Sequence, residues 1–379
     1  MWIAYLLGAC SLAAWIYLVW FRGGFWQISE TPECDAAEPQ PSVVTIVPAR
    51  NEESLIAVTI ASLFTQDYNG RFRIVLVDDH STDATVEAAG AHGRLSVIRA
   101  AEKPAGWTGK LWAVSEGLRY AEPYHPDYFL LTDADIIHSP ETLLRLVARA
   151  EAGRLDLVSW MVKLRAETLA ERALIPAFVF FFFMLFPPEW VASRQRTTAA
   201  AAGGCMLIRR TALERIGGIA SIRGELIDDC ALARAVKPGG AIWLGTGEES
   251  RSVRAYDTFG EIGGMISRSA FTQLRHSALL LGGTIVAMMI IFVAPLLLLF
   301  SRDSLAMALG LAAWGLMTYA YLPMLRFYRQ APGWGLLLPF VALFYTAATV
   351  HSAWRYWSGK GGEWKGRVQD ARRSQSSNL

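Results

Sequence analysis

An acidic tripeptide, Asp133-Ala134-Asp135, directly follows an apolar run that has the length and composition of a buried strand. The run is Tyr128-Phe129-Leu130-Leu131, so the two carboxylates stand where the strand ends. Hard oxygen ligands favour Mg²⁺ or Mn²⁺, which take one or two protein carboxylates and complete their shell with water and substrate phosphate. The tripeptide therefore predicts a strand that ends at a phosphate-bound divalent cation, although two acids can also cap the helix expected near Ser139.

Two further acidic pairs have similar positions in the chain. Asp78-Asp79 ends the apolar run at residues 74–77, and Asp228-Asp229 opens a later stretch with helical character. A surface without a function would scatter its carboxylates. The repeated placement of acids at element ends predicts that they gather in one site.

Short β-branched runs alternate with amphipathic stretches through the middle of the chain, which is typical of α/β domains. This alternation predicts a largely parallel sheet covered by helices on both faces, with ligands at the carboxyl ends of the strands. No G-x-G-x-x-G or G-x-x-x-x-G-K-[ST] follows any strand, so a nicotinamide dehydrogenase or P-loop ATPase has no support. Strands are expected at 43–47, 73–77, 95–98, 128–132 and 205–208, and helices at 52–66, 84–91, 110–121 and from Ser139-Pro140 onward.

Four long apolar segments flank this region, in a chain with 53% apolar and 18% charged residues. They are residues 1–21, 277–300, 304–324 and 334–354, and each is long enough to cross about 30 Å of hydrocarbon. The first has no positively charged start and continues past Cys10, so it is expected to be an anchor and not a secretion signal. The predicted organisation is an anchor at 1–21, a linker at 22–40, a catalytic domain at 41–276, a transmembrane region at 277–354 and a basic tail at 355–379.

A shorter apolar segment, residues 174–188, contains four consecutive phenylalanines and is interrupted by Pro176 and by Pro187-Pro188. Fifteen residues are few for a membrane span. We expect an interfacial helix that lines the entrance for a lipid acceptor, with another crossing or plain core as the alternatives.

Charge and cysteine content exclude several other functions. The formal net charge is +2 and no run of five like charges occurs, so nucleic acid is not an expected partner. Four cysteines without C-x-x-C spacing give no metal site or disulfide framework.

Six short motifs follow one another along the predicted domain: Val47 to Glu52, Val77 to Asp83, Gly109-Lys110, Thr132 to Asp135, Gly203-Gly204 and Asp228-Asp229. Together they resemble the family 2 glycosyltransferases of the GT-A fold. That resemblance implies a GT-A α/β domain with a mixed, mainly parallel sheet, here with transmembrane helices at both ends of the chain. Within the family, the layout and Phe271-Thr272-Gln273-Leu274-Arg275 look most like the hopene-associated glycosyltransferases of bacteria, and more distantly like ceramide glucosyltransferase.

The resemblance assigns five residues to the nucleotide-sugar donor. Pro48, Ala49 and Glu52 match the first-strand turn that contacts the nucleoside, with Glu52 near the ribose hydroxyls. Asp79 matches the acid that reads the uracil or ribose. Lys110 looks like the donor-loop lysine, a point charge for phosphate, unless it is only a solvated helix start.

The resemblance also separates the roles of the acidic pairs. It implies that Asp135 is the direct ligand of Mg²⁺ or Mn²⁺, while Asp133 contacts the ribose side or the cation through water. Asp229 matches the general base of an inverting displacement, and Asp228 stands where the family has glutamate. Capping of a helix N-terminus is the structural alternative for this pair.

Gln273 and Arg275 look like part of the Q-x-R-W type sequence that clasps the donor pyrophosphate in membrane-bound relatives. His276 stands where tryptophan is usual, and Thr272 stands where arginine often precedes the glutamine. The missing tryptophan argues against a processive polymerase and for a single sugar transfer.

The sequence thus predicts an inverting, metal-dependent hexosyl or N-acetylhexosaminyl transferase. It moves a sugar from a UDP-linked donor to a hydroxyl of a membrane lipid, which the resemblance suggests is hopanoid-related. The alternatives are a polysaccharide synthase of the same fold and a non-catalytic protein that binds or moves lipids.

The predicted location is the bacterial inner membrane, with several spans in the lipid bilayer. Arg22 is the first charge after the anchor, which places the catalytic domain in the cytoplasm. Three crossings would leave the basic tail outside, against the positive-inside tendency, unless one segment is re-entrant.

Overall fold

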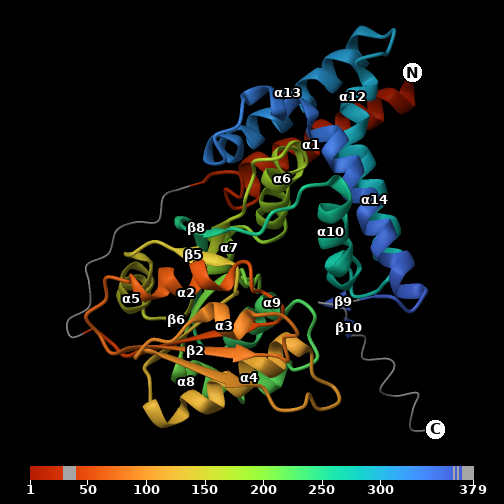
Figure 1. The fold of residues 1–379 in the computed structure, drawn as a ribbon. Coiled ribbons are helices and arrows are strands. Elements are labelled where there is room, and N and C mark those ends of the chain that lie inside the picture. The colour runs from red at the N-terminus through yellow and green to blue at the C-terminus, as the bar shows by residue number, and fades with distance from the viewer. Residues whose placement is uncertain (29–39, 362, 365–366, 369–379) are drawn as a thin grey trace. The chain divides into compact units, whose positions relative to one another are not determined.

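Two units make up the described residues, 1–28, 40–361, 363–364 and 367–368, of this computed structural model (Figure 1). The first, here called the apolar helical unit, comprises Met1–Ile28, Ala166–Glu189 and Tyr256–Gly362. The second, the sheet unit, comprises Ser29–Arg165, Trp190–Ala255 and Glu363–Leu379.

The sheet unit is built on one eight-stranded mixed sheet with the order β3-β2-β1-β4-β7-β6-β8-β5. The pairs β1–β2, β1–β4, β2–β3 and β6–β8 are parallel, and β4–β7, β6–β7 and β5–β8 are antiparallel. The predicted mixed, mainly parallel sheet is therefore confirmed. The strands are β1 Val43–Ala49, β2 Phe72–Asp78, β3 Leu95–Arg99, β4 Tyr128–Thr132, β5 Ile136–His138, β6 Leu155–Lys163, β7 Cys205–Arg209 and β8 Ala241–Ser252.

Burial explains why the central strands were recognisable in the sequence. Every residue of β1 and of β4 is buried, so both strands are continuous apolar runs without alternation. Helix α4 packs on β1 and β2 at its Gly117, where an added Cβ would lie 2.6 Å from a side-chain carbon of Ile46. The helices of this unit are α2 Ile56–Phe64, α3 Thr85–Ala89, α4 Gly109–Ala121, α5 Thr142–Gly153, α8 Arg210–Arg215 and α9 Asp228–Val236, with the short helices η1 Glu122–Tyr124 and η2 Ile219–Ile222, and α7 Pro188–Ala192 at its boundary.

Two predicted helix starts were wrong. The helix expected from residue 52 begins at Ile56, because Asn51 has a φ of 52° and Glu52 donates its backbone N–H to Thr85 Oγ1 at 2.8 Å. The helix expected from Ser139 begins at Thr142, after the unpredicted strand β5.

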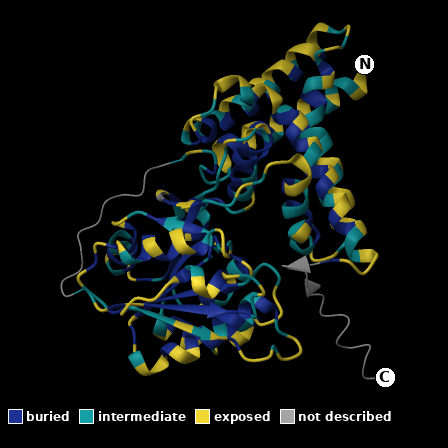
Figure 2. Ribbon diagram, in the orientation of Figure 1, coloured by how far each residue is buried: buried dark blue, intermediate teal, exposed yellow. Residues whose placement is uncertain are grey.

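The apolar helical unit contains four stretches that are long and apolar enough to cross a membrane, in agreement with the four predicted segments. They are Trp2–Phe21, Ala278–Leu298, Ser304–Phe327 and Pro332–Trp357. Figure 2 shows many exposed residues along these helices. Leu279, in the second stretch, has an exposed fraction of 85%. The elements are α1 Trp2–Phe21, α6 Leu169–Leu185, α10 Phe259–Gln273, α11 Ala278–Met288, η3 Met289–Val293, α12 Ala294–Leu298, α13 Ser304–Phe327, η4 Pro332–Leu337 and α14 Leu338–Trp357.

The phenylalanine segment differs from its prediction in extent and burial. Helix α6 starts at Leu169, after a capping box formed by Thr168 and Glu171, and continues through Pro176, which was expected to interrupt it. Phe180 is fully buried, with its ring centroid 5.0 Å from that of Tyr321 in α13. Packing between apolar helices thus keeps the proline-containing helix continuous.

The compact units also divide the chain differently from the predicted boundary of the catalytic domain at 41–276. Residues 166–189 and 256–276 group with the apolar helices. Part of the predicted linker, 29–39, and most of the basic tail, 362, 365–366 and 369–379, lie outside the described residues. The two-residue strands β9 Glu363–Trp364 and β10 Arg367–Val368 pair with each other.

His138, at the end of β5, is buried between two hydroxyl groups. Its Nε2 lies 2.9 Å from Thr132 Oγ1 and its Nδ1 lies 2.8 Å from Ser250 Oγ. Burial lowers the pKa of His138 from 6.5 to about 4. The imidazole is therefore neutral in the folded protein at every pH above that value.

A pH dependence of stability follows, because the unfolded chain protonates this histidine more readily than the folded chain does. The neutral His138 therefore contributes about 3 kcal/mol to the free energy of unfolding. This contribution is complete above about pH 6.5 and is lost as the pH falls towards about 4. We expect the thermal midpoint of the sheet unit, followed by tryptophan fluorescence, to fall across this pH range. The variant His138→Gln should show a flatter dependence, and an equally steep fall in the variant would contradict the assignment.

Candidate active site

Two of the three predicted acidic groups lie at strand ends on the same edge of the sheet. Strands β2, β1 and β4 are parallel neighbours, so Asp78-Asp79 and the acidic tripeptide follow strand ends that face the same way. The turn after β2 is tied to β1, because Asp79 donates its backbone N–H to the Ala49 carbonyl at 2.8 Å. The first turn of α9 supplies Asp228 and Asp229 to the same place.

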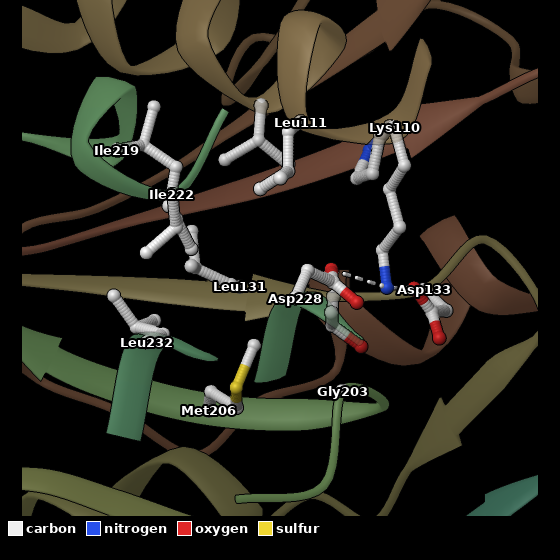
Figure 3. A pocket seen from close by; sticks show the side chains of 13 residues that line it. Lys110, Leu111, Leu131, Asp133, Gly203, Met206, Ile219, Ile222, Asp228 and Leu232 are labelled. Atoms are coloured by element: carbon white, nitrogen blue, oxygen red, sulfur yellow. Dashed lines mark ion pairs between the residues drawn. The ribbon is translucent and has the colours of Figure 1, made fainter. Parts of the chain in front are cut away.

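Lys110 joins two of the acidic pairs. Its Nζ lies 2.8 Å from Asp133 Oδ1 and 3.1 Å from Asp228 Oδ2 (Figure 3). Burial opposes the charge of this ammonium group, but the carboxylates of Asp133, Asp228 and Asp229 outweigh it and raise the pKa of Lys110. Helix α4 fixes the position of Lys110. Thr108, the residue before the helix, caps it by accepting the Leu111 backbone N–H. Lys110 is therefore a largely buried member of the acidic cluster. Its contact with donor phosphate remains a prediction.

Asp229 is held by two backbone N–H groups. Its Oδ2 accepts from Gly203 at 2.9 Å and its Oδ1 from Cys230 at 2.6 Å. The loss of water around this carboxyl group, followed by the nearby Asp228 carboxylate, raises the pKa of Asp229 to about 6. A base with this pKa is mostly ionised at neutral pH yet can accept a proton.

Gly203 has a specific reason to be glycine. A Cβ at this residue would lie 3.2 Å from Lys110 Nζ and 3.4 Å from Asp229 Oδ2. Any side chain would therefore crowd the two charged groups at the centre of the cluster.

The second acid of the tripeptide has a partner that the sequence did not indicate. Arg254 follows β8, and its Nε lies 2.5 Å from Asp135 Oδ2 while its Nη2 lies 2.6 Å from Glu52 Oε1. The backbone is joined here as well, since Val253 donates its N–H to the Asp135 carbonyl at 3.0 Å. No motif marks Arg254, and its place depends on the unpredicted β5–β8 pairing.

The residues predicted to contact the nucleoside lie at the end of β1 and in the turns after β1 and β2. Pro48 and Ala49 are its last two residues, and Glu52 follows in the turn. Asp79 is fully buried, 3.8 Å from Arg50 Nη1, which also donates to the Asp79 carbonyl at 2.5 Å. The contacts of these residues with a donor remain predictions.

Gln273 and Arg275 belong to the apolar helical unit. Gln273 is the last residue of α10, and Arg275 follows with a φ of 51°. Their proposed contact with pyrophosphate also remains a prediction.

A narrow apolar cavity of about 10 Å³ lies next to Lys110, Asp133 and Asp228 (Figure 3). Apolar walls reduce the water around charged groups and so strengthen their mutual attraction. The cavity therefore favours the tight Lys110 ion pairs. Its apolar side chains include Leu111, Leu131, Met206, Ile219, Ile222 and Leu232.

The acidic tripeptide fits a divalent cation by its chemistry. Within the described ranges, no group of three or more His, Cys, Asp or Glu side chains could enclose a metal ion. Mg²⁺ commonly needs only one or two carboxylates when substrate phosphates supply further oxygens. Asp133 and Asp135 match that requirement, and each already contacts a positively charged side chain.

Comparison with known sequences finds a family match that covers part of this site. Residues 44–217 match the family described as glycosyl transferase family 2. An N-acetylglucosaminyltransferase of Rhizobium leguminosarum bv. viciae is 39% identical over 95 residues, which cover 23% of this chain and 22% of that protein. An uncharacterized protein of Methanocaldococcus jannaschii is 31% identical over 105 residues, or 28% of this chain and 40% of that protein. The chain thus spans less than half of the length of these relatives.

Comparison with solved structures shows the fold. The mannosyltransferase PcManGT of Pyrobaculum calidifontis, solved in complex with GDP-Man and Mn²⁺, has a TM-score of 0.57 and 18% identity over 94% of this chain and 99% of that one. The predicted GT-A-like fold is confirmed, and the match of residues 44–217 to a glycosyltransferase family agrees with the predicted enzyme class. Likeness to the hopene-associated subgroup remains a prediction.

Proposed function

We propose that this chain, whose residues 44–217 form a glycosyltransferase family 2 domain, is a membrane-bound inverting enzyme that transfers one sugar from a UDP-linked donor to a hydroxyl of a membrane lipid. A hopanoid-related lipid is the acceptor that the subgroup resemblance favours. The observation that carries the proposal is Asp229, a carboxylate with a pKa of about 6 beside the Lys110 ion pairs.

The geometry supports a direct displacement. Asp229 takes the proton of the acceptor hydroxyl while the new glycosidic bond forms and the bond to the leaving phosphate breaks, which inverts the anomeric centre. The Gly203 N–H orients this carboxylate, and Lys110 supplies positive charge for the phosphates. A divalent cation at Asp135 and Asp133 would neutralise charge on the departing nucleotide.

The lipid acceptor is supported by the apolar helical unit. Four helices long enough to span a bilayer suggest membrane association, and a water-soluble acceptor would not need them. Helix α6, which carries the four consecutive phenylalanines, belongs to this unit, and Phe182 among them is half-buried. We propose that the protein lies in the bacterial inner membrane with its sheet unit in the cytoplasm, where nucleotide sugars are held.

Lipid analysis tests the proposed function. Membranes of cells that produce the wild type are compared by mass spectrometry with membranes of cells that produce Asp229→Asn. A lipid heavier by one sugar should occur only with the wild type. Identical lipid profiles, or a sugar polymer in place of a singly glycosylated lipid, would contradict the proposal.

Phe182 offers a test of the acceptor route. Phe181 is too buried for this purpose, with its ring centroid 4.9 Å from that of Tyr345, whereas Phe182 is half-buried beside Phe186. If α6 contributes to acceptor binding, Phe182→Ser should raise the apparent KM for the lipid by about tenfold, through lost apolar burial. Affinity for UDP should not change. The exposed Phe300, replaced in Phe300→Ser, serves as the control, and equal lipid kinetics in both variants would exclude this route.

A further inference from the structure

Arg254 occupies the position between two carboxylates that the proposed function assigns to the donor and its cation. Its guanidinium contacts Asp135 at 2.5 Å and Glu52 at 2.6 Å. The side chains of Glu52 and Asp135 are only 8% and 13% exposed, against 29% for Arg254. Both bonds are charge-assisted, and such bonds are strong when they are shielded from water.

The atom that Arg254 contacts is one that a cation would also need. Asp135 has two carboxylate oxygens, and Oδ2 faces the guanidinium in this structure. Arginine remains charged at all ordinary pH values, so deprotonation cannot release this contact. A cation that binds both carboxylate oxygens of Asp135 must therefore displace the Arg254 side chain.

Charge balance indicates where the released side chain would go. The site holds five acids, Glu52, Asp133, Asp135, Asp228 and Asp229. Ion pairs join Lys110 to Asp133 and Asp228, and join Arg254 to Glu52 and Asp135. A donor brings negative phosphates together with a divalent cation. A planar guanidinium is well suited to bind phosphate oxygens once it leaves a carboxylate.

We propose that Arg254 competes with the divalent cation for Asp135, and that phosphates of the donor relieve the competition by binding the released guanidinium. Arg254 is then a positioning residue that makes cation and nucleotide bind together. This inference rests on the proposed function, which assigns Asp135 to the cation and takes the phosphates to be those of a nucleotide.

Mn²⁺ binding to the full chain without nucleotide tests the competition. The free ion is followed by electron paramagnetic resonance while wild type, Arg254→Gln and Arg215→Gln are titrated with MnCl₂. Arg254→Gln should bind Mn²⁺ about tenfold more tightly than the wild type, the factor that corresponds to loss of one charge-assisted bond. A purely structural arginine would not produce tighter binding. Arg215→Gln is the matched control, because Arg215 makes a 2.5 Å ion pair with Asp156 outside the cluster and its loss should leave Mn²⁺ affinity unchanged.

The same titration with UDP present tests the second half of the proposal. UDP should tighten Mn²⁺ binding strongly in the wild type and several-fold less in Arg254→Gln, which lacks the phosphate partner. The ammonium group of Arg254→Lys cannot bridge both carboxylates, so the Mn²⁺ affinity of this variant should lie between those of the wild type and Arg254→Gln. Arg254→Lys replaces Arg254→Gln if the latter does not fold. Unchanged or weaker Mn²⁺ binding in the variants would overturn the competition. Because neither titration contains sugar or acceptor, these results stand apart from any failure of lipid transfer.

Discussion

Asp229→Asn is expected to lower kcat by about 10² to 10⁴, the usual cost of losing a positioned base. Asparagine preserves the size of the side chain but cannot take the proton of the acceptor hydroxyl. Binding of UDP, measured by calorimetry, should remain nearly normal because the base acts on the acceptor. Asp156→Asn is the matched control, because Asp156 pairs with Arg215 outside the cluster. The kcat of this control variant should stay close to that of the wild type.

The pH profile provides a second readout of the same residue. With a pKa of about 6, Asp229 becomes protonated as the pH falls below that value and can no longer act as a base. The wild-type rate should therefore decline on the acid side of about pH 6, and the residual rate of Asp229→Asn should lack this decline. A variant with wild-type kcat, or with the same acid limb, would refute the role.

Asp135→Ala is expected to abolish detectable turnover, because it removes the carboxylate proposed to hold the divalent cation, and metal stabilisation of the leaving group is worth several kcal/mol. The fold should survive, since Asp135 lies in the turn between β4 and β5 and its side chain pairs with Arg254. The measurements are sugar transfer, Mn²⁺-dependent binding of UDP, and the thermal midpoint.

Chelation of the cation should have the same effect on the wild type as the substitution. Asp156→Ala again serves as the control, since it too removes an acid that pairs with arginine. Full activity of Asp135→Ala in excess chelator would contradict the assignment of Asp135.

The parallel strands β1 to β4 were predictable because each is marked by a short pattern in its own sequence. Strands β1 and β4 are buried on both faces, so each appears as a largely apolar run without alternation, followed by residues that match the family motifs. Lys110, Asp133 and Asp228 were each predicted as site residues from their motifs. The ion pairs that join them could not be predicted, because they depend on the tertiary structure.

Arg254 and the strands β5 and β8 were missed for a physical reason. β5 has three residues, and β8 contains two glycines, Gly245 and Gly247, which weaken its strand signal. Their pairing joins residues more than a hundred positions apart, so only the tertiary structure brings Arg254 to Asp135. Helix α6 is a similar case, since its burial depends on contacts with Tyr321 and Tyr345 that no local pattern reveals.

The most direct measurement is transfer of a radiolabelled sugar by the purified full chain in lipid vesicles with Mn²⁺. A panel of UDP-linked and GDP-linked sugars is tested, and the product is separated by organic extraction. We expect label from a UDP-linked sugar in a lipid that carries one sugar with inverted anomeric configuration, and no product with Asp229→Asn. Transfer from none of these donors, retention of configuration, or label found only in a polymer would contradict an inverting lipid glycosyltransferase.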